Sequence, residues 1–284
     1  MIKHIVLGFI VSLGCFTAMQ GQTEASATEK IAHADWDRQE LSSEIIWKYH
    51  HFEDLFDSKQ SVTVFEIDLS KGTIALEIPH VETGFRTTSE FAVQADAIVA
   101  INGSFFNTKT GGSTVFLKQD GAVYSRTIEQ FTPYRENAGF AVDEKGDISV
   151  IQRPIEGWES LVSYPTLLAS GPLLIAQQEI VSQKDEKFNT NRHPRTAIGV
   201  TKDKRLIAVV VDGRNANAHG VSIGELSIIM EALGCTDAMN LDGGGSSAAW
   251  VKGQGVVNYP SDNKKWDHQG ERAVANALCF KLKK

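Results

Sequence analysis

Two aspartates follow short apolar segments of the sequence and are each joined to glycine, which places a carboxylate where chemistry can occur. Asp212 comes directly after three valines and precedes Gly213 and Arg214, whereas Asp242 follows the segment AMNL and precedes three consecutive glycines. A carboxylate at the end of a buried strand can serve as an acid, a base or a nucleophile, although Asp212-Gly213 also fits a plain turn. Three adjacent glycines usually mean unusual backbone angles or close contact with a ligand. Asp212 and Asp242 are therefore the candidate catalytic carboxylates, and the second segment is the more specific.

Groups that can hold an anion stand near both aspartates in the sequence. The segment NRHPRTAIGV at 191–200 carries two arginines and a histidine, and a guanidinium can grip a phosphate through two hydrogen bonds. The alternative interpretation is a solvated basic loop. Amides of a glycine turn can form a nest for an anion, but no GKS or GKT follows, so this is not a nucleotide P-loop. The candidate anion-binding residues are Arg195, Gly243, Gly244, Gly245, Ser246 and Ser247, with Arg192 and His193 beside the first.

Other residues have a structural explanation beside a functional one. Asn102 ends an apolar stretch and either caps its own turn or faces a cleft. Arg272 could contact a bound anion or form an ion pair at the surface. Trp250 and Trp266 can stack on a sugar or simply pack in the protein. Glu225 belongs to the capping box of a helix rather than to catalysis.

The elements that must position these residues are mainly strands. Alternating segments joined by turns predict hairpins at 118–124, around Asp120-Gly121, at 138–151 and at 196–213, and further strands at 61–69 and 273–280. A capped apolar stripe predicts a helix over 222–234, and a weaker pattern predicts one from 89 to about 94. The fold class is therefore α+β, with largely antiparallel or mixed β-sheets and a few packed helices in a single domain.

The chain divides into three unequal parts. A basic start, an apolar run and a polar exit predict a secretory signal peptide at 1–21, so we expect an exported protein, periplasmic or secreted. Leu13-Gly14-Cys15 resembles the end of a lipobox, which makes lipid anchoring at Cys15 the variant. Residues 22–40 are expected to be a flexible lead-in and 41–284 the domain. Cys235 and Cys279 fit either a disulfide or two buried thiols.

The composition limits which partners and cofactors can be expected. The net charge of −7, from 28 basic and 35 acidic side chains, argues against nucleic acid, because phosphate-backbone binding needs a basic surface. The eight histidines, among them His50, His51 and His193, lack two-metal spacing, and the cysteines lack CxxC spacing. We therefore expect no metal and no cofactor. We also expect no transmembrane helix once the signal is removed, because the apolar run is too short for a span.

Taken together, the motifs INGSFFN, RTAIGV, VDGR and NLDGGGSSA, with NYPSD after them, resemble the phosphodiester glycosidase domain over roughly residues 60–281. The resemblance implies hydrolysis of a sugar-1-phosphodiester at the glycosidic C1–O bond, giving free sugar and a phosphomonoester. It places Asp212, Asp242 and Arg195 in catalysis. The substrate, a sugar-phosphate small molecule or glycan phosphodiester, would be bound by Asn102, Thr196, Asn240, Gly243, Gly244, Gly245, Ser246 and Arg272.

Two other functions remain open at this point. The same glycines and arginine would serve a non-catalytic module that binds sugar phosphates of the envelope. A phosphodiesterase that cleaves the P–O bond is the other alternative, although such enzymes often use two metal ions. Glu271, directly before Arg272, and Ser104, where some family members carry glycine, depart from the family pattern.

Overall fold

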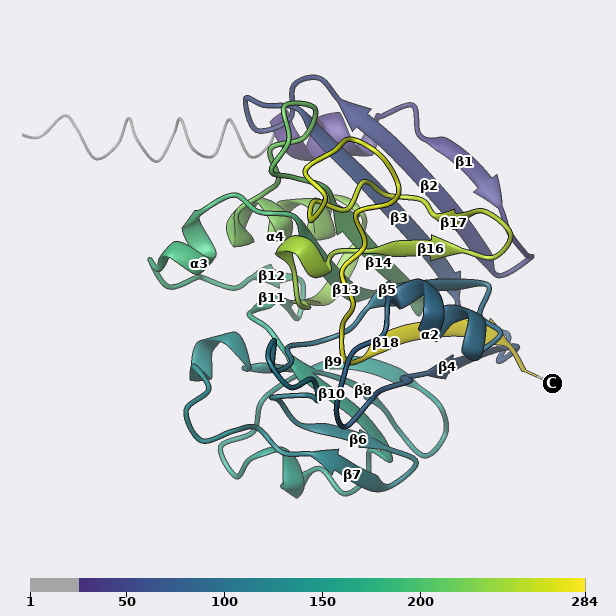
Figure 1. Cartoon of the computed structure of the whole chain (residues 1–284), viewed down its shortest axis with the longest axis vertical. Coiled ribbons are helices and arrows are strands. Elements are labelled where there is room, and N and C mark those ends of the chain that lie inside the picture. The colour runs from purple at the N-terminus through teal and green to yellow at the C-terminus, as the bar shows by residue number, and fades with distance from the viewer. Residues whose placement is uncertain (1–25, 284) are drawn as a thin grey trace, which may run out of the picture.

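Three antiparallel sheets form the frame of the computed structural model, which describes residues 26–283 (Figure 1). The expected signal peptide and Cys15 lie outside the described residues. All neighbouring strands within the sheets run antiparallel, as the repeated hairpin signals predicted. The expected α+β fold with largely antiparallel sheets is confirmed.

The largest sheet has eight strands in the order β1-β2-β3-β14-β13-β15-β11-β12. Its strands are β1 (Asp37–Glu40), β2 (Ile45–Phe52), β3 (Gln60–Asp68), β11 (Leu173–Ala176), β12 (Glu179–Ile180), β13 (Arg195–Thr201), β14 (Arg205–Val211) and β15 (Cys235–Asn240). Strands β14 and β15 both pair with β13, so they run parallel to each other and end at the same edge of the sheet.

Two five-stranded sheets complete the frame, in the orders β7-β6-β10-β8-β9 and β17-β16-β5-β18-β4. The first consists of β6 (Leu117–Gln119), β7 (Ala122–Ser125), β8 (Ala138–Val142), β9 (Ile148–Gln152) and β10 (Thr166–Ser170). The second consists of β4 (Ile74–Glu77), β5 (Val99–Asn102), β16 (Ala249–Val251), β17 (Gly255–Val256) and β18 (Ala277–Leu282).

One apolar core joins the three sheets. Phe65 of the large sheet, Phe140 of the first five-stranded sheet and Phe280 of the second are all buried in the same cluster. Alternate residues of β14 divide between the two faces of the large sheet: Val210 enters this shared core, whereas Val209 and Val211 pack on the opposite face. Because a strand places successive side chains on opposite faces, Asp212 continues the row that faces the other sheets.

Helices cover the outer faces of the sheets (Figure 1). Helix α4 (Ile223–Ala232) begins at Ser222, whose hydroxyl accepts a hydrogen bond from the amide of Glu225 while the Glu225 carboxylate accepts from the amide of Ser222. Its apolar side packs on the large sheet. Helix α2 (Thr88–Gln94) is capped in the same way and packs against β5 and β18. The short elements are α3 (Lys187–Thr190), η1 (Pro133–Arg135), η2 (Trp158–Ser160) and η3 (Gly244–Ser246).

Residues 26–40 are helix and strand in the structure rather than a loose lead-in. A helix covers 26–32, and β1 follows at the edge of the large sheet. Ala27 and Ile31, four residues apart and so on one helix face, are buried under the large sheet. This contact is long-range, and the polar, alanine-rich composition of the segment did not indicate it.

Cys235 and Cys279 are both free and buried. They belong to different sheets and different apolar clusters. The structure therefore supports the interpretation as two buried thiols over the one as a disulfide.

Candidate active site

The two aspartates are placed by the order of three neighbouring strands. Asp212 follows Val211 of β14, which lies opposite Arg195 on β13. On the other side of β13, the amide of Leu241 donates to the carbonyl of Thr196 (2.8 Å), and Asp242 comes next. Neighbouring strands are about 4.8 Å apart, so the two main-chain segments lie about 10 Å apart on either side of β13.

Asp212 is enclosed by donors. Its exposed fraction is 1%. Ser61 Oγ donates to Oδ2 (2.6 Å), while Asn258 Nδ2 and the amide of Tyr259 both donate to Oδ1 (2.9 Å each). Burial raises the pKa of Asp212 to about 6, although the bonds from Ser61 and Asn258 act in the opposite direction. The carboxyl group therefore titrates close to neutral pH.

Asp242 has a more open environment. It is only partly buried, and its Oδ1 accepts a hydrogen bond from the amide of Gly243 (3.0 Å). Burial raises the pKa of Asp242, while Ser246, the Gly243 amide, Arg272 and Arg195 favour its charged form. The residue is thus less enclosed than Asp212, and its carboxylate lies in the field of arginines.

Each glycine of the turn after Asp242 lies against a different arginine. A Cβ on Gly243 would stand 3.7 Å from Arg195 Cδ, and one on Gly244 would stand 2.9 Å from Arg214 Nη2. A Cβ on Gly245 would overlap Asp262 and Arg272. The absence of side chains therefore lets three arginines approach one short turn (η3), and Gly244 also has a positive φ of 64°.

Two of the three glycine amides are already used inside the protein. Gly243 donates to the Asp242 carboxylate, as above, and Gly244 donates to the carbonyl of Pro194 (2.7 Å). The anion nest expected from three free amides is therefore not present at these two positions. The physical reason is that the turn closes on its own aspartate and on the start of β13.

Arg195 is a buried anchor as well as a cation. Its Nε donates to the carbonyl of Val221 (3.1 Å), and its Nη2 donates to Phe188 (2.5 Å) and Asn191 (3.1 Å). Its guanidinium also lies over the Phe188 ring, 4.9 Å from the centroid. Burial, reinforced by Arg214 and Arg135, lowers the pKa of Arg195 to about 10. Nη1 takes no part in these hydrogen bonds.

Arg214 is the most available cation of the site, and the sequence argument did not select it. The residue is exposed and has a φ of 61°, a left-handed angle that costs energy for a side chain without Asn-like local bonding. Among residues 26–283, its guanidinium forms neither an ion pair nor a hydrogen bond. Only the position of Arg214 after a buried strand could have suggested it, because backbone angles cannot be read from sequence.

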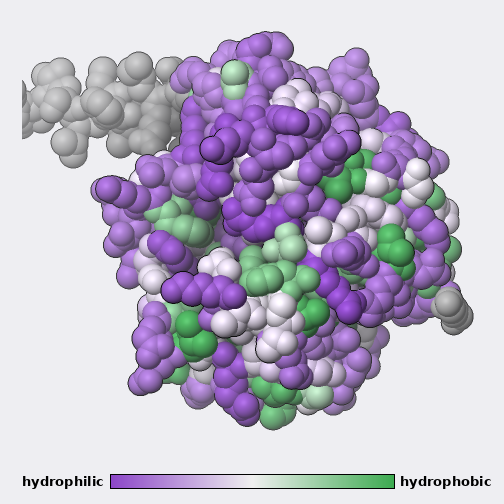
Figure 2. All heavy atoms as spheres, viewed as in Figure 1, coloured by the Kyte–Doolittle hydropathy of each residue, from purple (hydrophilic) through white to green (hydrophobic). Residues whose placement is uncertain are grey.

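Arg135, the last residue of η1, extends the cluster. Its guanidinium lies on the Phe188 ring, 4.2 Å from the centroid, so Arg135 and Arg195 both contact one aromatic ring. Within the described part of the chain, Arg135, Arg195 and Arg214 all lack a carboxylate partner. The face seen in Figure 2 is mostly hydrophilic, with smaller apolar areas between the hydrophilic residues. Three cations without ion-pair partners favour binding of an anion.

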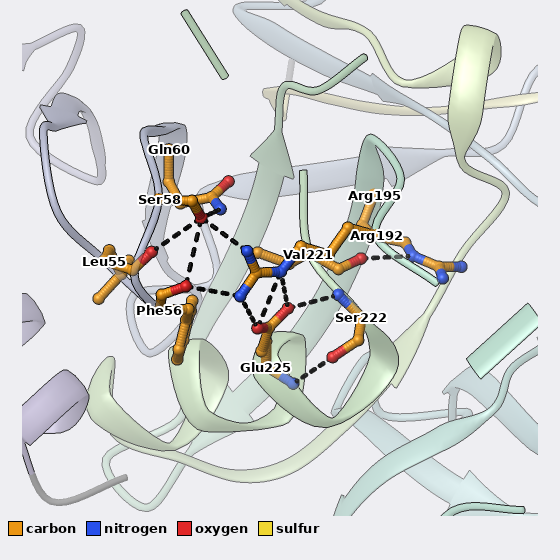
Figure 3. A network of polar contacts seen from close by, with 9 residues as sticks. All are labelled: Leu55, Phe56, Ser58, Gln60, Arg192, Arg195, Val221, Ser222 and Glu225. Atoms are coloured by element: carbon orange, nitrogen blue, oxygen red, sulfur yellow. Dashed lines mark hydrogen bonds and ion pairs between the residues drawn. The ribbon is translucent and has the colours of Figure 1, made fainter. Parts of the chain in front are cut away.

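Arg192, by contrast, is held in a structural network (Figure 3). It forms an ion pair with Glu225, and it donates to Ser58 Oγ (2.8 Å) and to the carbonyl of Phe56 (2.6 Å). Figure 3 shows the Arg195 side chain leaving on the other side of Val221. The same view shows Glu225 bonded both to Arg192 and to its helix cap, as its assignment to the capping box requires.

Asn102 joins three segments behind Asp242. Its Nδ2 donates to the carbonyl of Asp242 (2.7 Å), and its Oδ1 accepts from Thr196 Oγ1 (2.7 Å) and the amide of Ala248 (3.1 Å). The structure thus brings Asn102, Thr196 and Asp242 together, with the first two in supporting positions. Asn240 is also buried; its Nδ2 donates to Gly171 (2.8 Å), whereas its Oδ1 has no partner among the described residues.

Arg272 differs from Arg214 although both contact the glycine turn. Its Nε and Nη2 donate to the two carboxylate oxygens of Asp262 (2.7 and 2.8 Å). The Asp262 carboxylate balances the charge of Arg272, so Arg272 has a supporting role beside the glycine turn.

The two candidate sugar-stacking tryptophans both pack within the protein. Trp250 packs in the cluster under α2, and Trp266 stacks on Tyr259 with ring centroids 3.9 Å apart. Sequence reasoning missed Ser61 and Tyr259, which contact Asp212, because they come from distant segments.

Residues 26–283 contain no group of three or more His, Cys, Asp or Glu side chains that could hold a metal ion. In the same part of the chain, no helix is both long and apolar enough to cross a membrane.

Known proteins are similar to the chain over the part that contains both aspartates and the glycine turn. The family model described as Phosphodiester glycosidase matches residues 95–281. Mouse N-acetylglucosamine-1-phosphodiester alpha-N-acetylglucosaminidase is 27% identical over 211 residues, which are 68% of this chain and 39% of the mouse protein. The SPbeta prophage-derived uncharacterized protein YomE of Bacillus subtilis is 38% identical over 89 residues, 31% of this chain and 13% of that protein. The chain therefore spans about two fifths of the mouse relative.

Solved structures show the same fold. The zebrafish N-acetylglucosamine-1-phosphodiester alpha-N-acetylglucosaminidase catalytic domain, auto-inhibited by its pro-peptide, matches with a TM-score of 0.65 and 22% identity. That match covers 86% of this chain and 87% of the zebrafish domain. A hypothetical protein from Synechocystis matches with a TM-score of 0.67 and 18% identity over 87% of this chain and 64% of its own.

Proposed function

Because the chain belongs to the phosphodiester glycosidase family, we propose that it is an exported hydrolase that cleaves the glycosidic C1–O bond of a sugar-1-phosphodiester. The products are a free sugar and a phosphomonoester. The matched region, residues 95–281, includes both aspartates and the arginines around the glycine turn. The sugar-1-phosphodiester named for the mouse relative supports this class of substrate.

The observation that carries the proposal is the convergence of arginines without carboxylate partners on the glycine turn. Arg214 lies against Gly244, and Arg195 lies against Gly243. A phosphodiester brings one negative charge and two unbridged oxygens, which planar guanidinium groups bind well. We assign Arg214 the main contact because its donors are free, and Arg195 a second contact through Nη1. In this assignment the two guanidinium groups donate the hydrogen bonds to the phosphate that the sequence argument had given to the amides of Gly243 and Gly244.

The leaving group explains why these cations matter in the reaction. When the C1–O bond breaks, its electron pair stays on the phosphate oxygen, and the phosphomonoester gains charge. A phosphomonoester has a second pKa near 6, so it leaves without strong protonation by a general acid. Cations already in place stabilise the charge as it develops, which lowers the barrier.

Asp242 is assigned the contact with the sugar carbon or with water. It is partly exposed beside the arginines, whereas Asp212 is enclosed by three donors. Asp242 either attacks C1 and forms a glycosyl ester, which water then hydrolyses to the free sugar, or removes the proton of the water whose oxygen bonds to C1. In both cases the phosphate oxygen leaves C1 with the electron pair of the C1–O bond. Asp212 then acts as a positioning residue that fixes Tyr259 and the end of β14.

The test is hydrolysis of synthetic sugar-1-phosphodiesters in ¹⁸O-water, with product identification by mass. Cleavage of C1–O leaves the phosphomonoester without ¹⁸O. A phosphomonoester that carries ¹⁸O, or a sugar phosphate as product, would instead establish P–O cleavage. Saturable binding of the same compounds without any product would establish a binding module. Asp242→Asn serves as the matched inactive control.

A further inference from the structure

Cations continue beyond Arg195, away from the glycine turn. Arg135 and Arg195 both contact the Phe188 ring, with guanidinium carbons 4.2 and 4.9 Å from the ring centroid. The two guanidinium carbons are therefore no more than about 9 Å apart, the sum of these distances. Arg135 also lies over the Tyr134 ring (5.6 Å), and Lys184 Nζ lies 5.4 Å from the same centroid. A row of cations thus runs from Arg195 through Arg135 to Lys184.

The guanidinium of Arg135 is available to a ligand. The residue is half-buried, and its Nε donates to Tyr134 Oη (3.2 Å). Its Nη1 and Nη2 have no partner among residues 26–283, yet neither is a buried atom. The neighbouring carboxylate, Glu136, is fully buried and pairs with Arg153 (2.6 Å). Both terminal nitrogens of Arg135 can therefore donate to an anion that enters from solvent.

Lys184 adds a second cation next to Arg135. It is exposed, and within the described part of the chain its ammonium group forms neither a hydrogen bond nor an ion pair. Asp185 and Glu186 follow it in the sequence and are also exposed, but neither pairs with Lys184 or Arg135 in that same part. An ammonium group on a flexible stem can follow an anion that the more rigid guanidinium holds.

The segment that carries Arg135 is fixed to the rest of the protein. Directly after it, Glu136 accepts a hydrogen bond from Trp158 Nε1 (2.6 Å), and both side chains are buried. Asn137 Oδ1 accepts from the amide of Leu173 (2.8 Å) on β11, which pairs with β15, the strand before the glycine turn. Arg135 is therefore held in place before a ligand arrives, which reduces the entropy that binding costs.

One phosphodiester does not balance the charge of this row. Arg214 and Arg135 both act on Arg195 and, together with burial, lower its pKa. Like charges held together without counter-charges destabilise the folded chain. A phosphodiester brings one negative charge and Asp242 brings a second, against the four cations Arg214, Arg195, Arg135 and Lys184. Two of the four cations remain unbalanced when such a substrate is bound.

The place for a further negative charge is on the side of the phosphate away from the sugar. Under the proposed function, Asp242 faces the sugar carbon, and a carboxylate repels a second anion beside it. Arg272 and Arg195 favour the charged form of Asp242, whereas Arg135 lies beyond Arg195 on the Phe188 ring. A charge near Arg135 therefore belongs to the aglycone.

We propose that the substrate carries a second anionic group on its aglycone and that Arg135 and Lys184 bind this group. The inference rests on the proposed function, which places the first phosphate. The cleavage is the same: the C1–O bond breaks, its electron pair stays on the phosphate oxygen, and the phosphomonoester leaves with the second group attached. The next phosphate of a diphosphate, the next phosphodiester of a polymer and a carboxylate all supply the required charge.

Titration calorimetry with small anions tests the second site without hydrolysis. The probes are inorganic phosphate and three molecules with two anionic groups: pyrophosphate, ethylene glycol bisphosphate and phosphoglycolate. At least one of these three should bind about tenfold more tightly than phosphate. In Arg135→Gln this gain should fall about tenfold, the effect of one lost hydrogen bond to a charged group. The probe with the largest loss identifies the kind and spacing of the second group.

Arg126→Gln is the matched control, because Arg126 already pairs with Glu159 (3.3 Å). It should leave the gain unchanged, and Arg135→Lys, which keeps the charge, should retain most of it. Circular dichroism establishes that each variant is folded. The proposal is overturned if no probe with two anionic groups binds better than phosphate, or if Arg135→Gln and Arg126→Gln reduce the gain equally.

Kinetics separate this inference from the proposed function. The substrate pair is the methyl ester of a sugar 1-phosphate and the same compound extended by the anionic group that binds best. Arg135→Gln should lower kcat/KM for the extended compound more than for the simple one, and equal losses would overturn the role of Arg135. A protein with the Arg135-dependent gain in binding that releases sugar from neither compound would lose the proposed function and retain the anion site.

Discussion

The loops after β14 and β15 begin alike, with an aspartate followed by glycine, yet their surroundings differ. Asp212 receives three hydrogen bonds and is 1% exposed. Asp242 is partly exposed and lies in the field of Arg272 and Arg195, of which only Arg272 has an ion-pair partner. Two carboxylates at the same edge of one sheet can therefore take different roles. The role of each depends on the groups that bond or surround it, and not on its position at the end of a strand. The following predictions test this contrast, from the largest expected effect to the smallest.

Replacing each aspartate by asparagine should separate the two roles. Asp242→Asn removes the group that we propose to attack C1 or to activate water, so sugar release should fall on the order of 10²–10⁴-fold. Asp212→Asn should lower turnover much less, because an asparagine can still accept from Tyr259 and bond Ser61. The measurement is kcat/KM for a synthetic sugar-1-phosphodiester. Equal losses in both variants would contradict the assignment.

The arginines around the glycine turn should differ in the same way. Arg214→Ala removes the free guanidinium and should lower kcat about 10²–10³-fold, as the loss of one preorganised donor typically does. Arg272→Ala is the matched control, because the Arg272 charge is already balanced by Asp262. Its loss should be well below that of Arg214. The measurement is kcat for both variants on the same substrate. A larger loss in Arg272→Ala than in Arg214→Ala would show that Arg272, rather than Arg214, holds the phosphate.

The raised pKa of Asp212 should appear in the pH dependence of stability. Its pKa is about 6 in the folded chain and 3.8 in the reference state, so the folded state binds more protons between these values. Its contribution to stability is complete below pH 3.8 and is lost as the pH rises through 6. Between about pH 4 and pH 8 this loss amounts to about 2 kcal/mol. Urea unfolding of Asp212→Asn should show a decline with pH that is smaller by this amount, and an unchanged decline would refute it.

Local sequence signals predicted local structure well. The capping box of Ser222 and Glu225 and the Asp120-Gly121 hairpin turn are confirmed, because each depends on residues only a few positions apart. The pairing of β3 with β14 joins segments about 140 positions apart, and no local pattern could indicate it. The helix at 26–32 escaped prediction for the same reason.

The candidate site was predictable in part. The positions of both aspartates at the ends of strands followed from apolar runs that stop at a carboxylate. The partners of each group did not follow. Arg195 matched a motif, but its bonds to three carbonyls depend on where α3 and α4 lie. Arg214 was passed over because its freedom from partners is a property of the whole arrangement.

The position of β13 between β14 and β15 has a consequence for how this chain can change its preference among substrates. One inserted strand fixes the gap between the two aspartates, and its ladder of main-chain bonds resists stretching. If the chain has the proposed function, a change to a bulkier or smaller sugar cannot alter that interval without breaking the main-chain hydrogen bonds of the sheet. Any such change must come instead from the peripheral loops, so new specificities should arise by altering loop side chains around an invariant frame.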